Sequence, residues 1–127
     1  MHKISITHIS NAHTDWLRAL DFYKQELGLL KTRLTLIASK NTHAEVLKQV
    51  EHFENQFAIQ LGNISKLAHE IKENINSVAH DAASASAGFI SGDLAVKHTA
   101  LGSKFQTEEK IINDLRHSFN LFSAEWM

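Results

Sequence analysis

Apolar residues recur along this chain at alternating spacings of three and four positions, from residue 13 almost to the C-terminus. Such a row, which we call a seam, is typical of a helix that buries one face. The first seam comprises His13, Trp16, Leu20, Tyr23, Leu27, Leu30, Leu34 and Ile37. The second comprises His43, Leu47, Val50, Glu54, Phe57, Leu61, Ile64, Ala68, Ile71, Ile75, Val78 and Ala82. The third comprises Leu94, His98, Leu101, Phe105, Glu108, Ile112, Leu115, Phe119, Phe122 and Trp126. Each seam predicts one long amphipathic helix, because the two-residue alternation of a strand is not sustained beyond the first ten residues.

The breaks between the seams give the expected bounds of the elements. These are an extended arm over 1–11, helices over 12–40, 42–82 and 93–126, and a loop over 83–92. Thr42 and Glu45 have the spacing of a capping box, which favours a tight hairpin near Asn41 and a new helix after it. One continuous helix through this point is the alternative, since neither Gly nor Pro interrupts it.

The start of the third helix is open to two interpretations. The seam continues back to Leu94, which favours a start at Asp93. Ser103 is the alternative, because Gln106 follows it at the spacing of a second capping box. Short connections between long helices make them antiparallel neighbours. We therefore predict an all-α fold, an elongated up-down-up three-helix bundle that forms a single domain over 1–127.

Charge and composition exclude several classes of function. The formal net charge is -1, which lacks the basic excess of a general nucleic-acid binder. No apolar stretch approaches the ~18 residues of a membrane span, and the lack of a basic polar face disfavours a bundle that binds the membrane surface. The chain has no cysteine, which agrees with a reducing compartment, and we expect a cytoplasmic protein. Phosphate-binding loops and nucleophile motifs are missing, so we expect neither an enzyme nor a cofactor.

Nine histidines are the one unusual feature of the composition. Two hairpin turns would bring His13, His69 and Glu108 to the same level of the bundle. Two histidines and a carboxylate suit Zn²⁺ or Fe²⁺. A small metal-binding bundle that uses these three ligands is therefore the alternative function. The competing interpretation is that all three side chains lie at the surface or at a frayed helix end.

Glu54 lies on the second seam, where a lone buried carboxylate would be costly. We expect Phe53 to turn inward in its place and Glu54 to reach solvent. The alternative is a buried functional acid.

Three further apolar residues, Phe22, Leu29 and Leu36, are spaced by seven on the first helix. They lie about 130° from the centre of its seam, at 100° per residue, so they face away from the shared core. An exposed apolar stripe usually marks a contact surface, and two-fold pairing of identical stripes is the commonest way to cover it. We therefore expect a homodimer through the first helix, in a protein that acts as an assembly or protein–protein interaction module. The alternative is that the arm, with Ile4, Ile6 and Ile9, or the segment Phe89–Ile90, covers the stripe within one chain.

Overall fold

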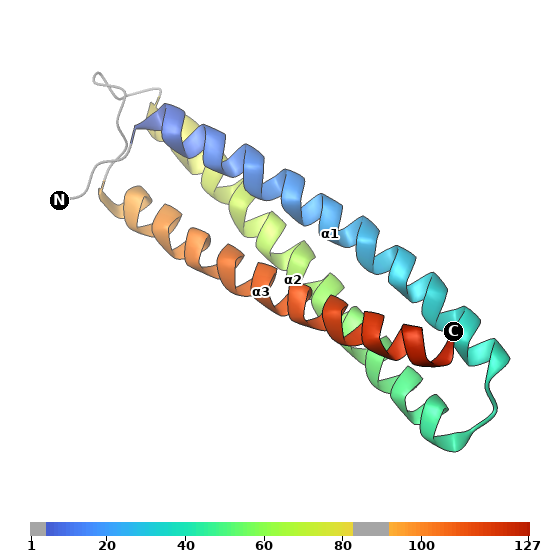
Figure 1. The fold of residues 1–127 in the computed structure, drawn as a ribbon. Helices are drawn as coiled ribbons and strands as arrows, with labels where there is room; N and C mark the ends of the chain where they lie inside the picture. Colours follow the sequence, from blue (N-terminus) through green and yellow to red (C-terminus); the bar gives the residue numbers. More distant parts are fainter. Residues whose placement is uncertain (1–4, 83–91) are drawn as a thin grey trace.

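The computed structural model describes residues 5–82 and 92–127, and these form three long helices. The helices are α1 (Ile6–Lys40), α2 (Ala44–Ala82) and α3 (Gly92–Trp126). In Figure 1, α1 and α3 run in the same direction and α2 runs back between them, along an elongated bundle. The predicted all-α, up-down-up three-helix bundle is confirmed.

The extended arm predicted over 1–11 is wrong for the residues from Ile6 onward, which belong to α1. Ser5 is the N-cap, and its hydroxyl accepts a hydrogen bond from the backbone N–H of His8 at 3.1 Å. Ile9 is fully buried against Val78 and Ala95, so the apolar seam extends one turn beyond His13. Serine capping and this extra buried residue together stabilise the earlier start. Residues 1–4 lie outside the described residues.

The hairpin after α1 is confirmed, and a continuous helix through this point is wrong. α2 begins at Ala44, so the N-cap position is His43 and the proposed capping box of Thr42 is not formed. Asn41 instead closes α1: its backbone is extended, and its amide donates to the carbonyls of Ile37 at 2.8 Å and Trp126 at 3.4 Å. One side chain thus ends the helix and contacts the C-terminus of α3.

α3 begins at Gly92, which confirms the start near Asp93 and excludes Ser103. Of the loop expected over 83–92, residues 83–91 lie outside the described residues. No helix in the described part of the chain is long and apolar enough to cross a membrane.

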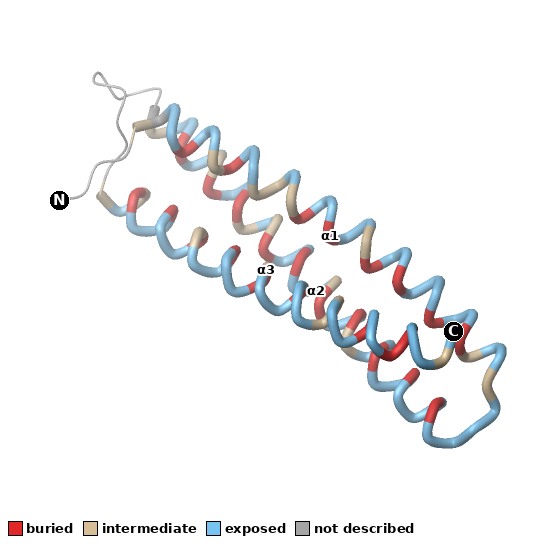
Figure 2. Tube along the Cα trace, in the orientation of Figure 1, coloured by how far each residue is buried: buried red, intermediate tan, exposed pale blue. Residues whose placement is uncertain are grey.

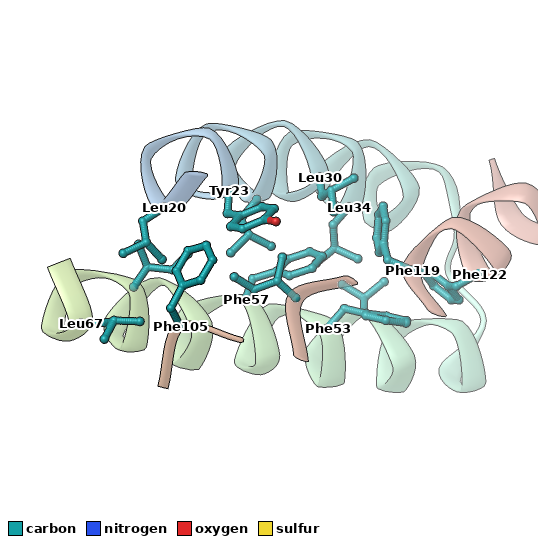
Figure 3. Close-up of a cluster of buried hydrophobic side chains, with 14 of the residues drawn as sticks. Leu20, Tyr23, Leu30, Leu34, Phe53, Phe57, Leu67, Phe105, Phe119 and Phe122 are labelled. Atoms are coloured by element: carbon teal, nitrogen blue, oxygen red, sulfur yellow. The ribbon is translucent and has the colours of Figure 1, made fainter. Parts of the chain in front are cut away.

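The core follows the seams of α1 and α3 closely, and Figure 2 shows the buried positions along the inner sides of the helices. Four phenylalanines fill the end of the bundle near the hairpin. Phe53 lies 5.3 Å from Phe119 and 5.1 Å from Phe122 between ring centroids, and Phe57 lies 5.3 Å from Phe119 (Figure 3). Each such ring stabilises the fold by about 1.5–3 kcal/mol through burial.

On α2 the buried stripe differs from the predicted seam. The buried residues are Val46, Val50, Phe53, Phe57, Gln60, Ile64, Leu67, Ile71, Asn74 and Val78. The helix is therefore rotated by about 50° from the expected orientation, at 100° per residue. Phe53 is buried and Glu54 is exposed, as expected, so a buried functional acid at Glu54 is wrong. The rotation places an aromatic ring in the core, and it also buries Gln60 and Asn74.

Candidate functional site

The structure does not bring the three predicted metal ligands together. The Nε2 atom of His13 lies 2.8 Å from the Oδ1 atom of Asn74. His69 is exposed and pairs with Glu73 one turn along α2, at 2.8 Å between Nε2 and Oε1. The third candidate, Glu108, is buried on α3. Because α2 turns Asn74 inward, His69 is left on the outer surface. Among the described residues, no group of three or more histidines and carboxylates is placed to hold a metal ion.

His13 instead belongs to a cluster of rings between α1 and α3, with His8, Trp16 and His98. The His98 ring stacks on Trp16 at 4.9 Å between centroids, and it meets His13 edge-on at 5.4 Å and His8 edge-on at 6.0 Å. His13 is 2% exposed and His98 is 5% exposed. We call the five residues His8, His13, Trp16, Asn74 and His98 the histidine layer.

Hydrogen bonding in the histidine layer is incomplete. The Asn74 carbonyl oxygen can only accept, so Nε2 of a neutral His13 carries the proton that it donates. The Asn74 amide nitrogen and the His98 Nδ1 atom are buried and have no hydrogen-bond partner within the described residues. If His98 takes up a proton on Nδ1, no acceptor among the described residues is therefore in place to receive a hydrogen bond from it.

Burial favours the neutral form of both histidines. Desolvation lowers the pKa of His13 below 6.5, although the hydrogen bond with Asn74 opposes this. Desolvation also lowers the pKa of His98, and the charges that His13 and His8 would carry lower it further. Near neutral pH the two buried rings are therefore uncharged.

A second buried polar pair joins α2 to α3. Glu108 is 6% exposed, and burial raises the pKa of its carboxyl group. With its nitrogen turned toward Glu108, the Gln60 amide donates to both carboxylate oxygens, at 3.1 and 2.7 Å. The opposite orientation of the same amide presents its oxygen, which can accept from a protonated carboxyl group. Gln60 can therefore satisfy Glu108 in either charge state.

Long polar side chains bridge α1 and α3 at the rim of the core. The Tyr23 hydroxyl donates to Oε2 of Glu109 at 2.7 Å. The Nη1 atom of Arg116 donates to both carboxylate oxygens of Glu26, at 2.6 and 2.7 Å. Burial and the neighbouring Glu109 raise the pKa of Tyr23 to about 12. These pairs fix α3 against α1.

The stripe of Phe22, Leu29 and Leu36 lies on the outer surface of α1. Their side chains are 57%, 72% and 46% exposed, respectively. Ile9, which was expected as one possible cover for the stripe, is buried elsewhere, against Val78. The other expected covers, Ile4 and Phe89–Ile90, lie outside the described residues, and the side chain of Ile6 is not described. No described residue covers the stripe.

The sequence reasoning missed Gln60 and Asn74 as buried residues. A usable signal was present in the row spaced by seven that contains them. From Val46 to Asn74 this row, Val46, Phe53, Gln60, Leu67 and Asn74, carries no charge, and its one charged residue, Asp81, comes at the end of α2. The predicted row has Glu54 in the body of the helix instead. Uncharged amides are less costly to bury than a carboxylate when they find partners.

Comparisons with models of known protein families, with curated proteins and with solved structures found no match for this chain.

Proposed function

We propose that this protein is a non-enzymatic assembly module in which two copies pair along α1. The observation that carries the proposal is the exposure of Phe22, Leu29 and Leu36, three large apolar side chains in one line. The line is about 21 Å long at 1.5 Å per residue. A row of exposed large apolar side chains is typical of a contact surface.

Charges beside the stripe favour an antiparallel pair. With the two-fold axis at Leu29, Phe22 of one copy faces Leu36 of the other. Glu26 then lies close to Arg33 of the second copy, and the reciprocal pair forms across the axis. Arg33 is exposed and has no ion-pair partner among the described residues, whereas Glu26 already accepts from Arg116. A parallel pair would provide no equivalent match of charges.

The stripe is narrow for an interface, which limits the expected affinity. A standard interface buries about 800 Å² on each partner, and three side chains supply only part of that area. Polar residues that flank the stripe would have to complete the contact. We therefore expect a dimer that forms at tens of micromolar and dissociates on dilution.

Sedimentation of the wild-type chain at about 100 µM tests the proposal. We expect a dimer, and we expect Leu29→Glu to give a folded monomer because paired glutamates repel across the axis. Leu121→Glu is the matched control, since Leu121 is 63% exposed on α3, away from the stripe. It should remain dimeric. A wild-type monomer at this concentration, or equal effects of the two substitutions, would refute the proposal.

Cysteine cross-linking tests the orientation, because the chain contains no cysteine of its own. Leu29→Cys should form a disulfide-linked dimer on mild oxidation, since the two Leu29 positions meet at the axis. Phe22→Cys alone should cross-link poorly, whereas Phe22→Cys mixed with Leu36→Cys should give the heterodimer. Efficient cross-linking of Phe22→Cys with itself would contradict the antiparallel arrangement and favour a parallel one.

A further inference from the structure

We infer that the histidine layer is a pH-sensitive contact, which holds the N-terminal ends of α1 and α3 together at neutral pH and releases them when its histidines take up protons. The inference is independent of self-association, because the layer lies inside the bundle and the stripe lies on its outer surface.

The contact between the two helix ends includes the apolar residues Ile9 and Ala95 and a cluster of rings. Trp16 of α1 stacks on His98 of α3, and its ring lies 3.2 Å from the position that a Cβ atom on Gly102 would occupy. The rings of His13 and His8 complete the cluster from the α1 side. Figure 1 shows that the N-terminal ends of α1 and α3 lie at the same end of the bundle. Protonation of this cluster therefore acts on the place where these two ends meet.

The groups around His98 offer little compensation for a positive charge. From α1 it faces His8 and His13, which would carry the same charge. From α2 the histidine layer includes the neutral Asn74, whose side-chain carbonyl already accepts a hydrogen bond from His13. Lys97, one residue before His98, is itself a cation. A protonated His98 would thus be surrounded by neutral or positive groups on these sides.

Carboxylates in the adjoining groove are already paired. Glu70 and Glu73 line this groove between α2 and α3, together with Asn74 and Lys104. Glu70 forms an ion pair with Lys104 at 2.9 Å, and Glu73 forms one with His69 at 2.8 Å. In the described part of the chain, neither carboxylate forms a hydrogen bond or an ion pair with His98. Charging the histidine layer at its present geometry is therefore unfavourable, and separation of α1 from α3 relieves the cost by hydrating the rings.

The sign of the pH dependence follows from the direction of the pKa shifts. Burial lowers the pKa of His13 and His98 below 6.5, so the unfolded or opened chain binds more protons than the closed bundle just below that pH. The closed state has its full stability above about pH 6.5 and loses it as the pH falls toward the lowered pKa values. The change is thus confined to mildly acidic conditions.

We expect the opening to be local. The end of the bundle near the hairpin is held by Phe53, Phe57 and Phe119, and these side chains do not titrate. The ion pair of Arg116 with Glu26 also links α1 to α3. Acid should therefore separate one end of the bundle while the other stays packed.

The first experiment follows Trp16 in the full chain with Trp126→Phe, which leaves Trp16 as the one tryptophan. Its emission should shift to longer wavelength between pH 7.5 and 5.0, with a midpoint below 6.5, while far-UV circular dichroism changes little. His98→Phe keeps a ring against Trp16 and should reduce the shift, and His98→Phe with His13→Gln should abolish it. His69→Gln is the control and should leave the shift unchanged, because His69 is exposed on α2.

The second experiment needs no substitution and remains decisive where a variant does not fold. Hydrogen exchange of the wild-type chain is compared at pH 7.5 and 5.5, after correction for the intrinsic effect of pH. We expect at least a tenfold loss of protection around His13 and His98, and no comparable loss around Phe57. Equal loss at all three places would show global unfolding and would overturn the inference. An emission shift that persists in the double variant would overturn it as well.

Discussion

Replacement of Gln60 by methionine tests how the buried carboxyl group of Glu108 is stabilised. Methionine has a similar length and volume, so Gln60→Met removes the amide with little loss of packing. At neutral pH the Glu108 carboxylate, which is 6% exposed, would then lose the two contacts at 3.1 and 2.7 Å. An unsatisfied buried charge costs about 3–5 kcal/mol when its partner is removed. We expect a smaller loss of about 2–4 kcal/mol, because Glu108 also lines a second, open pocket between α2 and α3, with Leu67 and Ile111, where water can reach it.

Removing both partners should have the opposite result. The double variant Gln60→Met with Glu108→Met leaves no polar group in this part of the core. Replacing a buried polar pair by apolar residues of similar volume is often neutral or stabilising by about 1–4 kcal/mol. We therefore expect the double variant to be at least as stable as the wild type. The two single variants and the double variant form a cycle that isolates the coupling between the two side chains.

Urea denaturation followed by circular dichroism measures all four proteins, and pH provides a further check. Burial raises the pKa of Glu108, so the folded state binds more protons than the unfolded state just above the ordinary Glu value of 4.5. This group contributes most to stability at low pH, and its contribution falls as the pH rises through the raised pKa. The cost of Gln60→Met should therefore be smaller at pH 4 than at pH 7. The reasoning would be refuted if Gln60→Met lowered the free energy of unfolding by less than about 0.5 kcal/mol at pH 7. It would also be refuted if the double variant were less stable than both single variants.

Three further predictions test other parts of the fold. Phe53→Ala should cost about 3–5 kcal/mol in urea denaturation and Glu54→Ala less than about 0.5 kcal/mol, and the reverse order would show that the orientation of α2 is wrong. The chain has a single tyrosine, so absorbance at 295 nm should show Tyr23 ionising near pH 12 in the folded protein and at a lower pH in Glu109→Gln. A midpoint near pH 10 in both proteins would contradict the half-buried hydrogen bond with Glu109. Gly62→Ala should raise stability by up to about 1 kcal/mol because a Cβ atom there meets nothing within 4 Å, whereas Gly102→Ala would press on Trp16 at 3.2 Å and should bring no such gain in a thermal melt.

The number and direction of the helices could be predicted from the sequence because the apolar period is sustained over so many residues. Helix ends were less predictable, and α1 illustrates the reason. The segment before residue 12 alternates apolar and polar residues, which suggested an extended arm. Ser5 nevertheless caps a helix there, and Ile9 gains burial against Val78. Contacts with a distant helix thus stabilise a helical conformation where the local pattern had suggested an extended one.

The orientation of α2 shows a different limit of sequence reasoning. Its two neighbouring rows each contain enough apolar residues to form a core, and a count of apolar positions favoured the row with Glu54. The choice depends on which polar residues find partners, and those partners lie on other helices. Asn74 meets His13 of α1, and Gln60 meets Glu108 of α3. Pairings across helices cannot be read from one helix alone, so the histidine layer could not be predicted either.

These pairings also explain how three similar heptad patterns specify one alignment. Apolar contacts change little when a helix slides by seven residues, because the pattern repeats with that period. Polar contacts do change: a slip of one heptad would bring Leu67 into the place of Gln60 or of Asn74, depending on its direction. Glu108 or His13 would then face an apolar side chain and lose a hydrogen bond in the core. Each buried pair therefore penalises a different misalignment of α2, one against α3 and the other against α1, as a single buried polar residue fixes the register of a coiled coil.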